Sequence, residues 1–172
     1  MRIDESQDAS LLRPLLERWL KICHGSKLSS IPVDKLVFDD YGLMDEDDEF
    51  GLTVSVEGVE QDLQARLDLG DGTLLLAWDG VEPVGFFAVF KVKSSLSDQF
   101  VAIETFWFAV PNHQLAGPAL FHRAKLWAKD NGCTHLIVSA SRLASDLHDK
   151  VASFCERVGM KPFETVFISE VA

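Results

Sequence analysis

The sequence predicts a single α/β domain, spanning residues 1–172, built around a mixed sheet. Apolar segments rich in Val, Ile, Phe and Trp alternate with segments whose apolar residues recur at helical spacing. Asp-Gly and Asn-Gly steps separate many of these segments. The chain has 172 residues, 47% of them hydrophobic, which suits one compact core rather than two.

The predicted elements follow the order β-α-α-β-β-β-α-β-α-β. They are a strand at 1–3, a helix from about 8 to 22, an irregular acidic segment at about 26–56, a helix at 56–69, strands at 73–78, 84–92 and 100–110, a helix with a buried stripe at 116–128, a strand at 135–139, a helix at 146–158 and a strand at 161–168. Asp8 or Ser10 is expected to cap the first helix, with Pro14 in its first turn, where a missing N–H is tolerated.

The segment FVAIETFWFAV, residues 100–110, is almost unbroken apolar sequence. Such a run is typical of a central strand that is covered on both faces. Glu104 alone interrupts it with a charge, and a buried carboxylate is costly unless it is paired or solvated. Two interpretations stay open: Glu104 is a general base, or it faces a polar cleft or a lysine.

The formal net charge of −11 argues against nucleic acid as a partner and favours basic partners, or reflects solubility alone. Three scattered cysteines and a charged N-terminus predict a cytoplasmic protein without a disulfide framework. No apolar run approaches the ~20 residues that cross a membrane. The spacing of His, Cys and carboxylates indicates no metal site.

The helix that follows the strand at 100–110 opens with the segment AVPNHQLAGPAL, residues 109–120. This segment contains Gly117 and Pro118, which weaken helices. A helix N-terminus has unpaired N–H groups that bind anions, and Gly117 removes a side chain that would keep a phosphate from the backbone. Many α/β turns also contain glycine, so this pattern alone stays ambiguous. Neither G-x-G-x-x-G nor G-x-x-x-x-G-K-[ST] is present.

The same segment resembles the acetyl-CoA signature of the GNAT superfamily of N-acetyltransferases, with Pro111, Gln114, Gly117 and Ala119 at the matching places. The order of elements is also similar along essentially the whole chain. The resemblance implies a mixed, mostly antiparallel sheet flanked by helices and acetyl-CoA as the co-substrate. It also implies an amine acceptor, and the pairing of two copies that is common in the family.

The resemblance also assigns residues. The strand would bulge and splay from the strand at 135–139 near Phe108, Ala109 and Val110, whose backbone would bind the pantetheine arm. A backbone N–H near Val110 would polarise the thioester. The pyrophosphate would contact the segment Gln114, Leu115, Ala116, Gly117, Pro118 and Ala119. Glu104 lies where related enzymes carry a general base.

Three positions depart from the family pattern. Cys155 stands where many members have a tyrosine that protonates the departing thiolate; it is a candidate acid or a core residue. His148 stands where many members have an asparagine at the cofactor, and it is otherwise a surface histidine. Pro118 removes one phosphate-binding amide. The sequence thus predicts an N-acetyltransferase of a cationic amine, with a catalytically inactive binding module of the same fold as the alternative.

Overall fold

The computed structural model describes residues 1–23, 55–95, 97–140 and 148–164. Its contacts divide the chain into two compact units, residues 1–19 with 57–139 and residues 20–56 with 140–172. The first unit holds the sheet, and the second contains the helix α5 (His148–Arg157). The acidic segment 39–49 lies outside the described residues, and the expectation of one domain over 1–172 stays a prediction.

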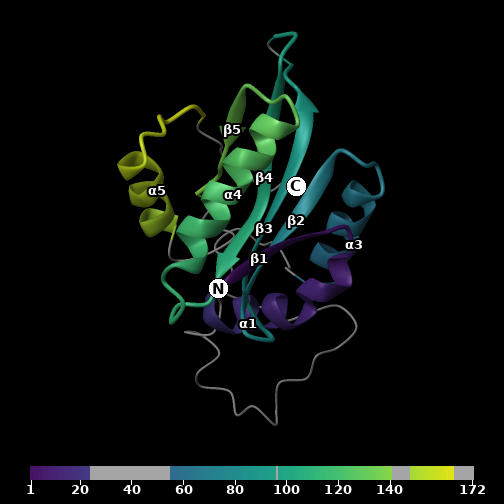
Figure 1. Ribbon diagram of the computed structural model, residues 1–172, viewed down its shortest axis with the longest axis vertical. Coiled ribbons are helices and arrows are strands. Elements are labelled where there is room, and N and C mark those ends of the chain that lie inside the picture. Colours follow the sequence, from purple (N-terminus) through teal and green to yellow (C-terminus); the bar gives the residue numbers. More distant parts are fainter. Residues whose placement is uncertain (24–54, 96, 141–147, 165–172) are drawn as a thin grey trace, which may run out of the picture. The chain divides into compact units, whose positions relative to one another are not determined.

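The first unit is an α/β structure with a five-stranded sheet in the order β1-β2-β3-β4-β5 (Figure 1). The strands are β1 (Arg2–Ser6), β2 (Gly72–Asp79), β3 (Glu82–Lys93), β4 (Phe100–Ala109) and β5 (His135–Ile137). Neighbouring strands are antiparallel except β4 and β5, which are parallel because the helix α4 (Ala116–Asp130) connects them. This confirms the mixed, mostly antiparallel sheet.

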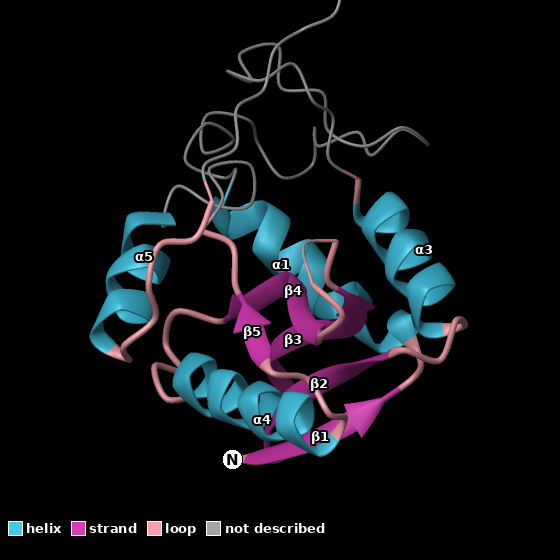
Figure 2. Cartoon of the chain, turned by 90° about the horizontal axis from the view of Figure 1, so that it is seen from above, coloured by secondary structure: helices cyan, strands magenta, loops and turns pink. Residues whose placement is uncertain are grey.

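Helices cover both faces of this sheet. Figure 2 shows α4 along one face, and the helices α1 (Arg13–Cys23) and α3 (Val56–Leu67) on the other. The core side chains explain why: Trp19 of α1 meets the ring of Phe106 edge-on, with centroids 4.8 Å apart. The next residue, Trp107, stacks against Phe121 of α4 at 6.0 Å. Consecutive residues of β4 therefore face opposite layers, as strand geometry requires.

Local sequence signals account for most element ends. The side chain of Asp8 accepts a hydrogen bond of 2.9 Å from the Ser10 amide at the start of the 3-10 turn η1 (Ala9–Leu12), which leads into α1. Pro14 is the second residue of α1, as expected. The strand expected from residue 161 is wrong at its start, because residues 161–164 have no strand pairing and are exposed to water. Residues 165–168 lie outside the described part of the chain.

Candidate active site

The strands β4 and β5 pair over only three positions and then part. Val101 lies opposite His135, and the last pair is Ile103 with Ile137. The pairing is short because β5 ends at Ile137, before the end at residue 139 that the sequence predicted, whereas β4 continues to Ala109. Among the described residues, the far half of β4 therefore has an edge without a strand partner, which we call the uncovered edge, and we call the point after Ile103 and Ile137 the fork.

Glu104 lies at the fork and is only 7% exposed. Its Oε2 accepts a hydrogen bond of 3.0 Å from the Ser139 amide, so a side chain of β4 replaces the ladder bond that β5 would otherwise make. Burial raises the pKa of Glu104 from 4.5 to about 7, while the Ser139 hydrogen bond lowers it in part. A carboxyl group that titrates near neutrality can accept a proton from an ammonium group.

A bulge follows Glu104 directly. Val89 of β3 lies opposite Glu104 and Ala88 lies opposite Phe106, which leaves Thr105 as an extra residue in β4. The expected bulge at 108–110 is therefore misplaced, because the register is regular again from Phe106 to Ala109. The Thr105 Oγ1 is buried and has no hydrogen-bond partner within the described structure. Sequence reasoning missed Thr105, since threonine is an ordinary strand residue.

Backbone direction distinguishes the three residues expected to bind the pantetheine arm. The Val110 amide donates to the Val84 carbonyl at 2.9 Å, so Val110 points toward β3. Along an antiparallel pair, the backbone N–H and C=O groups of successive residues point alternately toward the partner strand and away from it. The backbone groups of Phe108 therefore also point toward β3, and those of Ala109 point toward the uncovered edge. The Val110 amide is therefore not available to polarise a thioester, and Ala109 is the residue whose backbone faces that edge.

The loop before α4 offers fewer amides than expected. The Ala116 amide donates to the His113 carbonyl at 2.9 Å, closing a turn, and the Ala119 amide donates to the Leu115 carbonyl at 3.1 Å as the first α-helical bond. Pro118 has no N–H. The amides of Leu115 and Gly117 have no backbone acceptor among the described residues. Leu115 caps the helix without a side-chain hydrogen bond, which leaves this N-terminus open to an anion.

Gly117 serves helix packing more than ligand access. A side chain built there would point at the Trp107 ring, 3.5 Å away, and at the Ala109 Cβ, 3.8 Å away. The bare side of Gly117 therefore faces the sheet, contrary to the expectation that it clears space for a phosphate. Its backbone amide remains the relevant group.

A cavity of about 430 Å³ lies beside this loop. Gln114 lines it together with Leu115 and Ala116, and so do Asp79 and His113, whose Oδ2 and Nδ1 are 3.6 Å apart. Gln114 thus lies beside the opening of α4, and its role in binding the pyrophosphate stays a prediction.

The remaining two predicted site residues belong to the second unit. Cys155 is a half-buried residue of α5 that forms no disulfide within the described ranges, and its carbonyl accepts a hydrogen bond of 2.9 Å from the Met160 amide. His148 is the first residue of α5. Their roles as acid and cofactor ligand stay predictions.

No helix in the described ranges is long and apolar enough to cross a membrane. The same residues contain no cluster of three or more His, Cys, Asp or Glu side chains suited to a metal ion.

No protein-family model matches the sequence, and no curated protein sequence matches it significantly. Solved structures do match the fold. A probable acetyltransferase is 21% identical, with a TM-score of 0.62 over 99% of this chain and 100% of that one. An aminoglycoside 6'-N-acetyltransferase from Acinetobacter haemolyticus is 17% identical, with a TM-score of 0.60 over 100% and 99%. A transcriptional regulator from Bacillus halodurans is 16% identical, with a TM-score of 0.67 over 99% of each chain. The chain therefore has the fold of the GNAT acetyltransferases.

Proposed function

We propose that this protein is an acyl-CoA-dependent N-acyltransferase that transfers an acetyl group from acetyl-CoA to a primary amine. The observation that carries the proposal is the position of Glu104: a buried carboxyl group, with its pKa raised to about 7, lies where two parallel strands part. From there the uncovered edge of β4 leads past Ala109 to the unpaired amides of Leu115 and Gly117. This path suits a long cofactor with an anionic end.

In the proposed reaction the pyrophosphate binds the amides at the start of α4, and the pantetheine arm lies along the uncovered edge. The Ala109 backbone then makes the bonds that a neighbouring strand would make. Burial keeps water away from the fork, so the amine and the thioester meet in a fixed orientation.

Glu104 removes a proton from the ammonium form of the acceptor. The neutral nitrogen attacks the thioester carbon and forms the C–N bond, and the tetrahedral intermediate collapses as the C–S bond breaks. The sulfur leaves with the electron pair of that bond as CoA thiolate. Cys155 is the proposed donor of a proton to that sulfur, and the extra proton on nitrogen passes to solvent, from which the Cys155 thiol is restored.

A cationic amine is the proposed acceptor class. The net charge of −11 attracts cations at long range. Proteins of the same fold include aminoglycoside acetyltransferases, and aminoglycosides carry several amines. The charge and the fold together favour a polyamine-like or aminoglycoside-like acceptor over a neutral one.

The test is release of CoA thiol from acetyl-CoA in the presence of a panel of amines that includes an aminoglycoside, spermidine and a lysine-rich peptide. At least one cationic amine is expected to accelerate thiol release in proportion to enzyme, with the acetylated amine detected by mass spectrometry. If the protein binds acetyl-CoA but no amine is acetylated, the transferase proposal fails.

The second candidate is a binding module of the same fold without turnover. The observation that favours it is the likeness to a transcriptional regulator, at a TM-score of 0.67. Pro118 and Cys155, which depart from the transferase signature, are compatible with such a role. Failure to bind acetyl-CoA at millimolar concentration would favour this candidate.

A further inference from the structure

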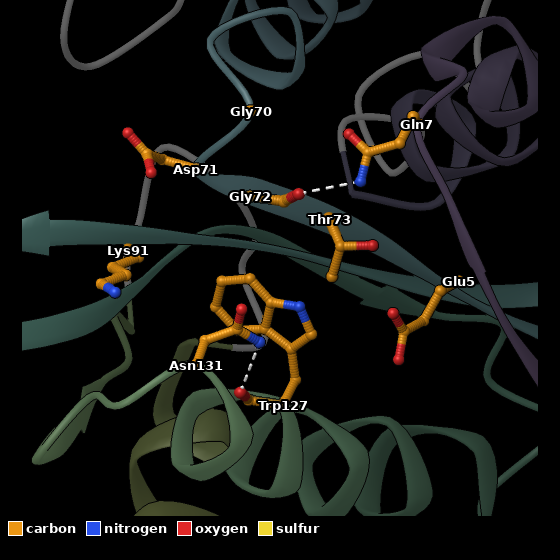
Figure 3. A pocket seen from close by; sticks show the side chains of 9 residues that line it. All are labelled: Glu5, Gln7, Gly70, Asp71, Gly72, Thr73, Lys91, Trp127 and Asn131. Atoms are coloured by element: carbon orange, nitrogen blue, oxygen red, sulfur yellow. Dashed lines mark hydrogen bonds between the residues drawn. The ribbon is translucent and has the colours of Figure 1, made fainter.

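A second cavity, of about 250 Å³, lies at the opposite end of α4 from the candidate active site. It is lined by the strand β1, the start of β2, Lys91 of β3 and the last turn of α4 (Figure 3). The 15 residues between Ala116 and Asn131 place it roughly 22 Å along the helix axis from the loop that opens α4. Its volume equals that of roughly eight water molecules, so a ligand of about eight non-hydrogen atoms fits.

Trp127 supplies a hydrogen-bond donor that points into this cavity. The side chain is 7% exposed, and its indole lies across the cavity below Thr73 and beside Glu5 (Figure 3). Within the described structure the indole N–H has no hydrogen-bond partner. Because this N–H opens onto the cavity, it is available to donate to water or to an oxygen of a bound ligand.

Charges of both signs face the same cavity without neutralising one another. Lys91 lines it, and so do the carboxylates of Asp71 and Glu5. The Lys91 amide donates to the Asp71 carbonyl at 2.6 Å, which holds the two backbones together, yet the ammonium of Lys91 contacts the Phe100 ring, at 4.4 Å from its centroid, rather than a carboxylate. Glu5 forms its ion pair with Arg123.

These charges select against simpler ligands. An anion alone would face the Asp71 carboxylate, because Glu5 is already paired with Arg123, and a cation alone would face Lys91 and the Trp127 N–H. The Asn131 Nδ2 donates to the Trp127 carbonyl at 2.9 Å, which leaves its Oδ1 as a further acceptor for an N–H group. A molecule with one carboxylate and one ammonium group satisfies both sides.

We propose that this cavity is a binding site for a small zwitterion of the size of an α-amino acid. Its carboxylate binds the Trp127 N–H and the Lys91 ammonium, and its ammonium group binds Asp71 and the Asn131 Oδ1. The site is separate from the candidate active site and does not depend on the transferase activity.

The test uses isothermal titration and the indole N–H resonance of Trp127 with three probes. L-Threonine carries both charges, 1-amino-2-propanol carries only the ammonium group, and 3-hydroxybutyrate carries only the carboxylate. L-Threonine is expected to bind at least tenfold more tightly than either half and to shift the Trp127 indole N–H. Trp127→Phe, Lys91→Met and Asp71→Asn should each weaken it about tenfold, whereas Lys129→Met and Asp130→Asn, on the same helix but outside the cavity, should not.

The proposal is overturned if no probe shifts the Trp127 indole resonance at a concentration of about 10 mM. It is also overturned if 1-amino-2-propanol or 3-hydroxybutyrate binds as tightly as L-threonine. It is also overturned if the two control variants weaken binding as much as the cavity variants. Because Lys91→Met and Asp71→Asn alter half-buried or exposed side chains, they test the site even if Trp127→Phe does not fold.

Discussion

The Glu104 carboxylate accepts a hydrogen bond of 3.0 Å from the Ser139 amide at the point where β4 and β5 stop pairing. The side chain thereby satisfies a backbone donor of the segment that follows β5 and is held at the fork. The same burial that keeps it there raises its pKa to about 7. The Glu104 carboxyl group therefore both holds the Ser139 backbone at the fork and titrates near neutral pH.

Replacement of Glu104 by Gln is expected to lower kcat by about 10²–10⁴-fold, because a positioned general base contributes that much. The glutamine oxygen still accepts the Ser139 hydrogen bond, so the fork keeps its shape. The wild-type rate should rise with pH and level off above about pH 7, where Glu104 is ionised. Rate measurements from pH 5 to 9 check this, and an unchanged profile in E104Q removes Glu104 from the role of base.

The same pKa predicts how stability depends on pH. Glu104 has a folded-state pKa of about 7, above its ordinary value of 4.5, so the folded state binds the proton more tightly than the unfolded state. Its contribution to stability is fully present below pH 4.5 and is lost as the pH rises to about 7; the difference corresponds to roughly 3 kcal/mol. Urea unfolding of the wild type and E104Q across this window should show the decline in the wild type only. If the free energies of unfolding of the two proteins change with pH in the same way, the prediction is wrong.

Thr105→Val is expected to leave the free energy of unfolding unchanged or raise it by about 1 kcal/mol. The Thr105 Oγ1 is buried without a partner, and removal of such a group relieves an unmet hydrogen bond. Thr73→Val is the matched control, because the Thr73 hydroxyl is buried and donates to the Ser6 carbonyl at 3.3 Å. Thermal unfolding should rank T105V above T73V, and the opposite order would show that Thr105 has a structural partner.

Gly117→Ala is expected to raise stability by up to about 1 kcal/mol and to preserve acetyl-CoA affinity. The added Cβ makes an ordinary contact of 3.5 Å with the Trp107 ring, and alanine favours the helix. In contrast, Gly85→Ala places a Cβ 2.9 Å from the Phe108 carbonyl oxygen and should destabilise the sheet. Calorimetry with acetyl-CoA checks both variants. Loss of binding in G117A would mean that a phosphate contacts the Gly117 Cα after all.

The apolar pattern of the sequence predicted β2, β3, β4 and α4, because each of them buries several apolar side chains. It placed the first strand at 1–3 rather than at Arg2–Ser6, because the side chains of β1 are half-buried or exposed and only Ile3 carries an apolar signal. It was also sufficient for Glu104, since a lone charge in an apolar run stands out. The sequence could not predict the direction of the backbone hydrogen bonds. Whether the backbone groups of Ala109 or of Val110 face the uncovered edge depends on the register of β4 with β3. The bulge at Thr105 and the turn that engages the Ala116 amide likewise depend on tertiary pairing.

The central claim is that CoA lies along the uncovered edge of β4 and ends on the amides that open α4. Amide chemical-shift changes on titration with CoA measure this directly. The account predicts large shifts for Ala109, Leu115 and Gly117, and small ones for Val110 and Ala116, whose amides already donate to Val84 and His113. Shifts confined to other parts of the sheet, or none at millimolar CoA, would contradict it.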